Sequence, residues 1–434
     1  MRKTVTRQGI NTKQFAQKLV QHSTAFEHAV ILNSNNYAQE GKWFNGNSAI
    51  ELLAAIGEVG EIKNTLTTLQ PNHANDWLFG YISYDAKNSI ESSLTSKNPD
   101  RIGFNQVLFF TPRFVLQLAN SSLTVSYLPE VNSKTEVEEM INAIIEINTP
   151  KPEDSNSFKI NHSVTQSDYL ARVEQIKEHI HRGDVYKLNY CVEFFSEKRT
   201  INPIATYNKL TNISPTPFAA FLKTGDRYLL SASPERYIKR IGNKVISQPI
   251  KGTAKRGATN ESDIDLKTRL QNDPKEQSEN IMITDLVRND LAKVALRGSV
   301  KVEELMGVYT FPQVHQLIST ISAEVDANTT WLDIVKATFP MGSMTGAPKM
   351  SAMQLIELYE VTKRGLYSGA VGYIAPNGDF DFNVVIRSLL YNHETNSLSF
   401  SVGSAITANS NAEQEYKECL LKASALLKAL NAEL

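Results

Sequence analysis

Two side chains in this sequence are placed to act on a substrate, one as an amine and one as an acid. Lys251 lies in segment 248–253 (QPIKGT), which we expect to be a strand end running into a tight loop, because the proline stops strand pairing and the glycine permits a sharp turn. Glu235 follows a proline that ends another expected strand. Each has a simpler explanation, since a lysine beside glycine is usually a solvated turn and a glutamate beside arginine is usually a weak surface ion pair.

The expected strands bring these two residues together. Residues 218–223 and 227–233 are expected to form a hairpin, and the chain then runs through 237–241 directly to the strand that precedes Lys251. Antiparallel neighbours bring their ends close to each other. Glu235 and Lys251 are therefore predicted to share one pocket.

Three glutamates are candidates for binding a metal ion. Glu279 lies in a helix that Asp273-Pro274 opens, within an apolar stripe shared with Met282 and Leu286, where a carboxylate needs a partner such as an arginine or a metal. Glu415 and Glu418 stand three positions apart on the last helix, a spacing that usually marks a solvated face. Joined to Glu279, they suit a hard cation, with Mg²⁺ the first choice because it takes few protein oxygens and keeps its waters.

Other residues are candidates for binding an anion. Arg387 lies in the apolar segment 383–391, expected to be one strand, where its partner is a carboxylate of either the protein or a substrate. Segment 339–349 places glycines before a helix start, which is typical of an anion site. Lys187, on an expected strand, is either a surface lysine or an anion contact. The lone His315 is of a kind that is more often structural than catalytic.

The composition excludes several function classes. The chain has 434 residues, a net charge of −1 and 21% charged residues, so nothing favours nucleic acid or an anionic membrane as a partner. Its two cysteines predict no disulfide framework. No apolar run approaches membrane-spanning length, and the first residues lack the apolar core of a signal peptide. We therefore expect a cytoplasmic protein.

The elements that must position the candidate residues predict an α+β protein. Residues 1–148 alternate helix-like and strand-like patches, with a strand break expected at Pro112, and they are interpreted as scaffold. Segment 149–157, which contains two prolines, is the best linker candidate. Residues 158–434 hold the catalytic candidates and open with a helix between Thr165 and Gly183. Both parts are expected to be interleaved in one compact unit.

Taken together, these segments resemble the chorismate-utilising enzyme family over residues from about 167 to 430, about three-fifths of the chain. The motifs that carry the resemblance are Ser233-Pro234-Glu235-Arg236, Pro249-Ile250-Lys251-Gly252-Thr253, Glu279-Asn280, 285–290 (DLVRND), 345–349 (TGAPK), 369–373 (GAVGY), Ile386-Arg387 and Glu415-Tyr416-Lys417-Glu418. Several independent motifs in one order make a chance match negligible. The family fold implied is a two-lobed α+β sandwich of large antiparallel β-sheets with helices outside, which agrees with the strand-rich pattern.

The resemblance also implies a role for each candidate. Mg²⁺ on Glu279 and Glu418, with Glu415 close by, is expected to hold the ring carboxylate of chorismate. The enolpyruvyl carboxylate is expected to be held by Tyr367, Arg387 and the backbone around Gly403. Further substrate-binding positions of the family are matched by Thr253, His315, Thr345 and Lys349.

Position 251 discriminates between branches of the family. Anthranilate synthases generally carry alanine there, whereas lysine is similar to the branch that makes 4-amino-4-deoxychorismate for 4-aminobenzoate and folate synthesis. The resemblance to that branch implies that Glu235 protonates the departing C4 hydroxyl and that Lys251 attacks C2 as a neutral amine before ammonia displaces it. Lys187 departs from this pattern, because it stands where aminating members usually have glutamine and where isochorismate and salicylate synthases have a lysine that activates water.

The alternatives are therefore anthranilate synthase component I, an isochorismate or salicylate synthase and, from a different class, an inactive chorismate-binding subunit. The intact acid, amine and glutamates argue against the inactive subunit. No glutaminase Cys-His arrangement is visible in the sequence. We therefore expect ammonia to come from a separate glutaminase subunit that docks on the surface.

Overall fold

Antiparallel strands form the frame of the molecule in the computed structural model, which describes residues 1–37, 50–66, 76–148, 157–312 and 314–434. Twenty strands belong to one hydrogen-bonded network, and a short parallel pair, β7 (Phe158–Lys159) and β22 (Ala432–Glu433), stands apart from it. The expected linker, 149–157, lies outside the described residues except for its last position.

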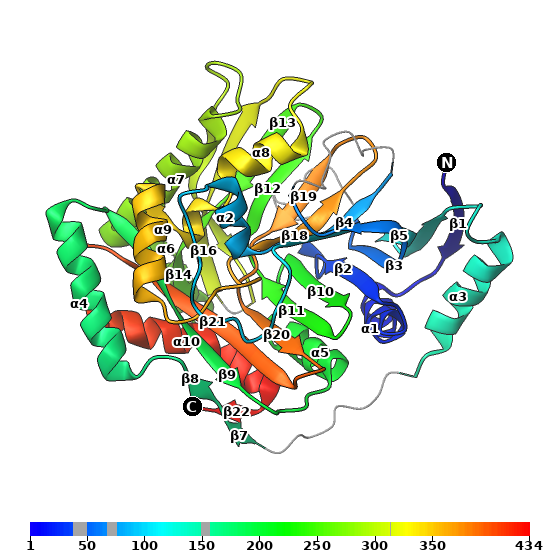
Figure 1. Cartoon of the computed structure of the whole chain (residues 1–434), viewed down its shortest axis with the longest axis horizontal. Coiled ribbons are helices and arrows are strands. Elements are labelled where there is room, and N and C mark those ends of the chain that lie inside the picture. The colour runs from blue at the N-terminus through cyan, green and yellow to red at the C-terminus, as the bar shows by residue number, and fades with distance from the viewer. Residues whose placement is uncertain (38–49, 67–75, 149–156, 313) are drawn as a thin grey trace.

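The network divides into two series of strands, which we call the first and the second lobe (Figure 1). In pairing order, the first lobe contains β1 (Lys3–Gln8), β6 (Ser122–Tyr127), β5 (Val107–Ala119), β3 (Leu52–Lys63), β2 (His28–Asn33), β10 (Phe218–Thr224), β11 (Arg227–Ser233), β20 (Ser388–Asn392), β21 (Ser397–Ile406) and β9 (Lys187–Ser196), with the short β8 (Asn161–His162) and β17 (Gly346–Ala347) against β9. The second lobe contains β5 again, then β4 (Leu78–Ile82), β18 (Ala370–Ile374), β19 (Phe380–Asn383), β12 (Arg236–Ile241), β13 (Lys244–Gln248) and β16 (Val314–Glu324), with β14 (Ile250–Lys255) and β15 (Lys301–Thr310) also against β16.

Strand β5 belongs to both lobes and joins them. Its first part, from Val107 to Phe110, pairs with β4, and its second part, from Phe114 to Leu118, pairs with β3 and β6. The break expected at Pro112 is therefore wrong: the strand continues through the proline, which lies opposite Glu58 where the pairing changes partners. A proline is tolerated there because the ladder is already changing neighbours.

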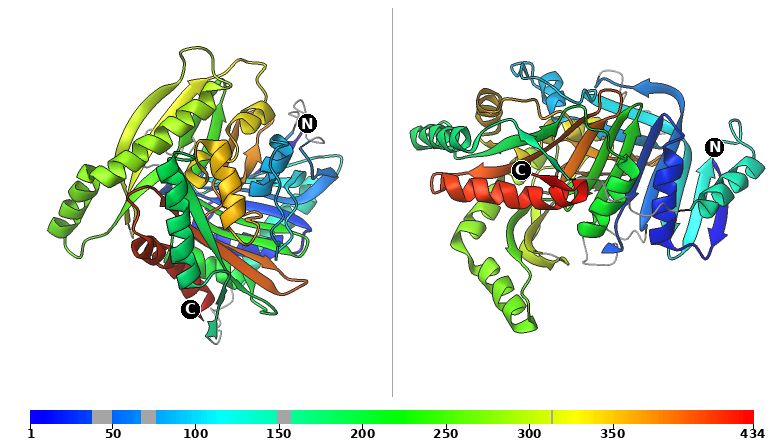
Figure 2. Two further views of the ribbon diagram at one scale, coloured as in Figure 1. Left: turned by 60° about the vertical axis from the view of Figure 1, so that its left-hand side comes forward. Right: turned by 90° about the horizontal axis from the view of Figure 1, so that it is seen from below.

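Helices cover the outer face of the first lobe. They are α1 (Thr12–Ser23), α3 (Lys134–Glu146), α4 (Gln166–Arg182), α5 (Pro203–Ile213) and α10 (Ala412–Leu430). Seen from below, α10, α5 and α1 form a row along this face (Figure 2). Their apolar sides bury one hydrophobic core, which includes Leu19, Val173, Leu210 and Leu426. The caps expected for α4 are confirmed, because Thr165 accepts the Asp168 amide hydrogen bond and Gly183 adopts the left-handed conformation.

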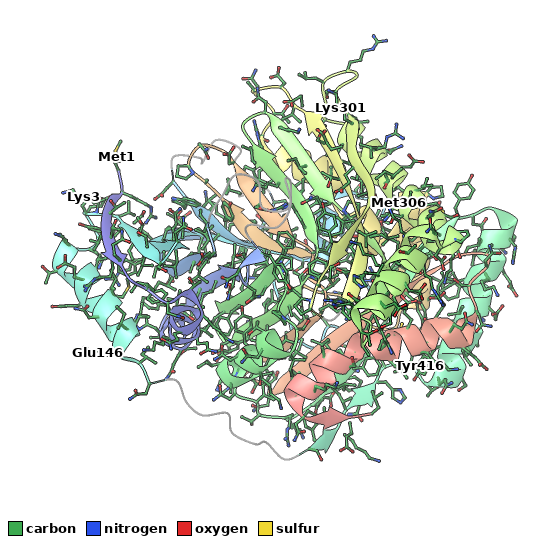
Figure 3. All side chains as sticks on the ribbon, turned by 180° about the vertical axis from the view of Figure 1, so that it is seen from behind. Met1, Lys3, Glu146, Lys301, Met306 and Tyr416 are labelled. Atoms are coloured by element: carbon green, nitrogen blue, oxygen red, sulfur yellow. The ribbon has the colours of Figure 1, made fainter. Side chains whose placement is uncertain are left out.

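A second hydrophobic core lies between the lobes. Residues of β2, β3, β10 and β11 meet residues of β4, β18, β12 and β16 there, together with α8 (Trp331–Thr338). The helices α6 (Asn260–Asn272) and α7 (Pro274–Ala292) pack on β14 and β16 of the second lobe. The short α2 (Lys87–Ile90) and α9 (Lys349–Tyr359) complete the described helices. In the view from behind, β15, marked by Lys301 and Met306, stands above α10, marked by Tyr416 (Figure 3).

Two of the places where the chain crosses between the lobes are adjacent, and each of these two crossings carries a candidate residue. Glu235 lies between β11 of the first lobe and β12 of the second, and Arg387 lies between β19 and β20. The crossings are bonded to each other, because the Val384 amide donates to the Glu235 carbonyl at 3.0 Å and the Ala232 amide donates to the Arg387 carbonyl at 3.1 Å. Segment 383–391 is therefore not the single strand that its apolar residues predicted, and Arg387 adopts a left-handed φ of 53° at the turn.

Candidate active site

A cavity of about 610 Å³ opens between the two lobes. Both strand ends and helices line it, and the two lobe crossings lie at its wall. The predicted site residues that line it are Lys187, Glu235, Lys251, Thr253, Glu279, Tyr367, Arg387, Gly403, Glu415 and Glu418. Its size is within the range of small-molecule sites in proteins.

Lys251 lies within a strand and not at a loop tip as the sequence indicated. It belongs to β14, whose pairing with β16 is irregular between Ile250 and Thr253, and Gly252 takes a φ of 108° at this bulge. The bulge aims the amine across to α7, where its Nζ lies 2.7 Å from Oε2 of Glu279. Burial alone would lower the pKa of Lys251, but the negative charges of Glu279 and Glu418 raise it above its ordinary value.

Glu235 is an acid held in a dry environment. It is buried at the crossing between β11 and β12, and its backbone amide donates to the Ser233 hydroxyl. Burial raises the pKa of Glu235 to about 7, although the nearby Lys187 and Lys251 act in the opposite direction. A carboxyl group that keeps its proton near neutral pH can serve as a general acid.

Lys187 is a second amine in the same cavity. It is buried near the start of β9 and shows no carboxylate within ion-pair distance in the described ranges. Burial, and then the neighbouring Lys251 charge, lower the pKa of Lys187 to about 8. Of the two interpretations left open for it, the surface lysine is excluded.

Arg387 lines the cavity and has no carboxylate partner among the described residues. Its guanidinium makes no ion pair with any residue that the structure describes, and its Nη1 donates a long hydrogen bond of 3.5 Å to the Lys422 carbonyl. Burial lowers the pKa of Arg387. Beside it, the Tyr367 side chain is buried, and burial raises the pKa of that phenol. Since no protein carboxylate occupies the arginine, the geometry favours a carboxylate from a ligand.

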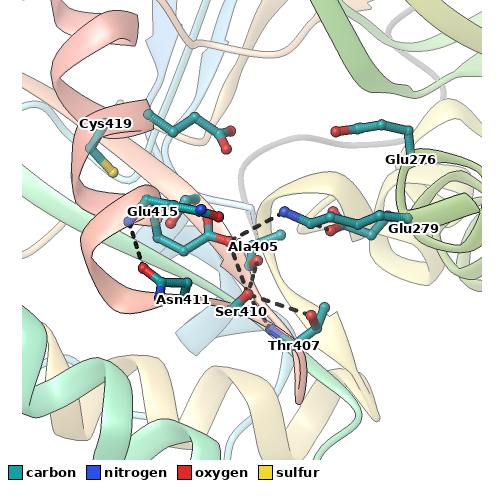
Figure 4. Close-up of polar contacts among 12 residues, drawn as sticks. Glu276, Glu279, Ala405, Thr407, Ser410, Asn411, Glu415 and Cys419 are labelled. Carbon is teal, nitrogen blue, oxygen red and sulfur yellow. Dashed lines mark hydrogen bonds and ion pairs between the residues drawn. The ribbon is translucent and has the colours of Figure 1, made fainter. Parts of the chain in front are cut away.

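Besides Glu235, four carboxylates face the cavity, from helices of the two lobes. Glu276 and Glu279 project from α7, and Glu415 projects from the opposite helix α10 (Figure 4). Glu418 follows Glu415 by one helical turn, and despite burial, Lys422 and Lys251 lower the pKa of Glu418 to about 2. Lys422 reaches Glu418 at 2.7 Å and also donates to the Gly403 carbonyl at 2.8 Å. This acidic cluster comprises Glu276, Glu279, Glu415 and Glu418.

The acidic cluster has the donor chemistry for a hard divalent cation. All of its groups are carboxylates, and Glu279 and Glu415 keep only 4% and 3% of their side-chain surface exposed. Within the described part of the chain, no three His, Cys, Asp or Glu side chains are already close enough to hold one metal ion. Lysine ammonium groups lie between the carboxylates instead, which shows that the cluster needs positive charge.

For three predicted residues the structure corrects the expectation, because they do not line the cavity. His315 is buried in β16 with its ring between Asp263, at 2.9 Å, and Thr310, at 3.0 Å. The Thr345 hydroxyl donates to the Met341 carbonyl. Lys349 pairs with Asp290 and donates to two backbone carbonyls, so it fixes the start of α9.

Backbone pairing explains why segment 339–349 does not offer the expected anion site. Gly346-Ala347 pairs with β9 as β17, so these backbone groups serve the sheet. Only Ser343 and Met344 of this segment reach the cavity. A glycine-rich helix start indicates backbone amides that could bind an anion, but it does not show whether a neighbouring strand forms hydrogen bonds with them.

The sequence interpretation missed Glu276 and Lys275, both on the first turns of α7. Glu276 precedes Glu279 by three positions, the same spacing as the pair Glu415 and Glu418, so the signal was present. Glu279 itself is on the buried side of α7 with Ile283 and Val287, and not with Met282 and Leu286 as the stripe suggested.

Comparison with known proteins now identifies the class. The model of the chorismate binding enzyme family matches residues 22–428, so the chain belongs to this family and the predicted resemblance is confirmed. The Bacillus subtilis aminodeoxychorismate synthase component 1 is 37% identical over 281 residues, which cover 64% of this chain and 58% of that protein. The chain thus matches less than two thirds of the length of that relative.

Two solved structures share the fold. Anthranilate synthase component I from Streptococcus pneumoniae is 28% identical, with a TM-score of 0.71 and coverage of 80% of each chain. The menaquinone-specific isochorismate synthase of Escherichia coli is 17% identical, with a TM-score of 0.76 over 99% of this chain and 95% of that one. The expected two-lobed sandwich of antiparallel sheets is confirmed. No helix in the described ranges is long and apolar enough to cross a membrane.

Proposed function

We propose that this chain aminates chorismate with ammonia to give 4-amino-4-deoxychorismate, a precursor of 4-aminobenzoate and folate, in a Mg²⁺-dependent reaction. The observation that carries the proposal is the Lys251 amine, which lies in one cavity with the buried acid Glu235 and the unpaired Arg387. The similarity to an aminodeoxychorismate synthase component 1 supports the same branch. Chorismate has two carboxylates, and the proposal gives each a separate cationic partner, Arg387 for one and a bound Mg²⁺ for the other.

The cavity residues divide the substrate between them. Arg387 and Tyr367, with the backbone near Gly403, bind the enolpyruvyl carboxylate. Glu279 and Glu418, with Glu415 and Glu276 close by, are the residues that would hold Mg²⁺. When bound, the ion supplies the charge that neutralises and orients the ring carboxylate.

The chemical step then uses the acid and the amine. Lys251 in its neutral form attacks C2 of the ring while Glu235 gives its proton to the C4 hydroxyl, which leaves as water. Ammonia next attacks C4, the bond from C2 to the lysine nitrogen breaks, and the amine is regenerated. Because Glu279 raises the pKa of Lys251, the amine must part from that carboxylate before it can act.

A second candidate function is isomerisation of chorismate to isochorismate, in which water attacks C2 while the C4 hydroxyl leaves as water. The observation that favours it is Lys187, a buried amine with a pKa of about 8 that can accept a proton from water. Anthranilate synthesis is less well supported, because the nucleophilic amine at position 251 has no role in it.

The test is to incubate the purified chain with chorismate, Mg²⁺ and an ammonium salt and to identify the product. We expect 4-amino-4-deoxychorismate from the native chain, and loss of that product or conversion to anthranilate from Lys251→Ala. Unchanged aminodeoxychorismate production by the variant would exclude the nucleophilic role of Lys251. Isochorismate would favour the second candidate, and the absence of any product would point to a chorismate-binding subunit.

We further propose that a separate glutaminase subunit delivers the ammonia, as the name component 1 of the Bacillus relative suggests. The purified chain is then expected to use ammonium but not glutamine. Activity of this chain alone with glutamine would contradict the proposal.

A further inference from the structure

One ammonium group bridges the two helices that carry the acidic cluster. Nζ of Lys275, on α7, lies 3.8 Å from Oε1 of Glu279 on the same helix and 3.6 Å from Oε1 of Glu415 on α10. Both carboxylates are almost fully buried, whereas the lysine keeps 49% of its side-chain surface exposed. The glutamates face each other across the gap between the helices (Figure 4).

Lys275 differs from the other lysines of the cluster in how loosely it is held. Lys251 and Lys422 each reach a carboxylate at 2.7 Å, with 20% and 27% of their side chains exposed. The Lys275 distances exceed hydrogen-bond length, so its contribution is mainly electrostatic. A long, half-exposed side chain with no close hydrogen bond can turn into solvent without breaking other contacts.

The two carboxylates that Lys275 approaches belong to helices of different lobes. Helix α7 packs on β14 and β16 of the second lobe, and α10 packs on β21 of the first. Two buried carboxylates from different lobes repel each other unless a cation lies between them. Among the described residues, Lys275 lies within 4 Å of both carboxylates, whereas Lys251 pairs with Glu279 alone.

We propose that Lys275 is a displaceable counter-ion: it holds Glu279 and Glu415 together until a divalent cation enters the acidic cluster, and it then moves out and sets the affinity for that cation. This inference rests on the proposed function, from which it takes the metal ion. It assigns a positioning role to a residue that does not react with substrate.

The proposal requires opposite effects on two measurable quantities. Replacing Lys275 by methionine keeps the length of the side chain and removes its charge. The metal-free chain then loses its counter-ion and becomes less stable, whereas the entering ion no longer competes with an ammonium group and binds more tightly. A lysine with only a structural role would weaken both.

The experiment compares the native chain, Lys275→Met and the control Lys255→Met. Lys255 is an exposed lysine of the same cavity, so the control removes the same charge from the same wall. Mg²⁺ binding is measured by titration calorimetry, and Mn²⁺ binding by electron paramagnetic resonance, both without chorismate. Thermal unfolding is measured in chelator and in saturating Mg²⁺.

We expect Lys275→Met to bind either ion about tenfold more tightly, the effect of removing one like charge at a distance of several ångströms. Its unfolding temperature should fall by about 2 °C in chelator and match that of the native chain in saturating Mg²⁺. Lys255→Met should stay within about twofold of the native affinity.

Equal or weaker metal binding by Lys275→Met, or an equal loss of stability with and without Mg²⁺, would overturn the proposal. So would an absence of Mn²⁺ binding to the native, substrate-free chain. A product assay on the native chain separates this failure from that of the proposed function. If the native chain aminates chorismate but metal binding by Lys275→Met is not tighter, the proposal for Lys275 is rejected and the proposed function stands.

Discussion

Two ionisable side chains of the cavity change in opposite directions for one reason. Loss of water contacts disfavours the charged form, so the pKa of Glu235 rises to about 7 and that of Lys187 falls to about 8. The acid therefore keeps its proton, and the amine gives its proton up, close to neutral pH. This would suit the proposed protonation of a leaving hydroxyl.

The raised pKa of Glu235 predicts the pH dependence of amination. In the proposed mechanism the protonated acid is required, and it is lost as the pH rises through about 7. The slope of log kcat/KM per free ammonia against pH should therefore decrease by one unit above that value, whatever slope the deprotonation of Lys251 adds. Steady-state rates across the range, corrected for the ammonium equilibrium, test this expectation.

Lys187→Met provides the matched control for that change of slope. The Lys187 charge lowers the pKa of Glu235, so its removal should move the change of slope to higher pH, whatever the height of the profile. A change of slope that stays in place, or moves to lower pH, would show that another group governs it.

At this scale the sequence predicted most of the charged residues that gather in the cavity, while their chemical roles stay a prediction. Glu235, Lys251, Arg387 and the three glutamates were found because their residue types are costly to bury without a partner. The Thr345 hydroxyl is taken by the nearby Met341 carbonyl, whereas His315 and Lys349 each meet a partner far away in the chain, Asp263 for the histidine and Asp290 for the lysine. Nothing in the local sequence reports either distant partner.

Among the elements, the bulge in β14 matters most, because it aims Lys251 at α7. At Gly252 the φ of 108° is one that other residues rarely adopt, and a Cβ there would lie 2.8 Å from Cδ1 of Leu317. The expected tight loop and the observed bulge use the same glycine. The sequence indicated the special backbone but not that β16 would pair along it.

Gly252→Ala should therefore destabilise the chain by about 1–3 kcal/mol and displace the amine. We expect a lower midpoint in urea unfolding together with a reduced kcat for amination. Gly242→Ala is the control, because Gly242 also has a positive φ, of 57°, but has open space around its Cβ and lies outside the cavity. Native kcat in Gly252→Ala, alongside reduced stability, would contradict the link between the bulge and Lys251.

Helices were easier to predict than strands. The starts of α4, α7 and α10 follow from Thr165, Asp273-Pro274 and Asn411, whose side chains or rings act within a few residues. The strand predictions were wrong at Pro112 and at segment 383–391, where the chain passes from one lobe to the other. Such crossings depend on distant partners, and an apolar run alone cannot reveal them.

In the whole molecule, the N-terminal strands complete the sheets that carry the site. Strand β2 pairs with β10, and β4 pairs with β18, so both lobes lose an inner neighbour if residues 1–148 are removed. The sequence divided the chain into scaffold and catalytic regions, but their interleaving in space depends on these long-range pairs.

A fragment of residues 158–434 should therefore fail to fold alone. Removing β2 to β5 exposes sheet edges and the core between the lobes. We expect no cooperative thermal unfolding and no near-ultraviolet circular dichroism from the fragment, and recovery of both on co-expression with residues 1–148. A cooperative transition in the isolated fragment would show that the catalytic region is an independent domain.

The acidic cluster draws two of its carboxylates from α7 and two from α10, and these helices belong to different halves of the sandwich. A divalent ion bound by both pairs would link the two lobes across the cavity. Neutralising the substrate and closing the enzyme around it would then occur in one binding step. The affinity for the ion would then determine how readily the product dissociates.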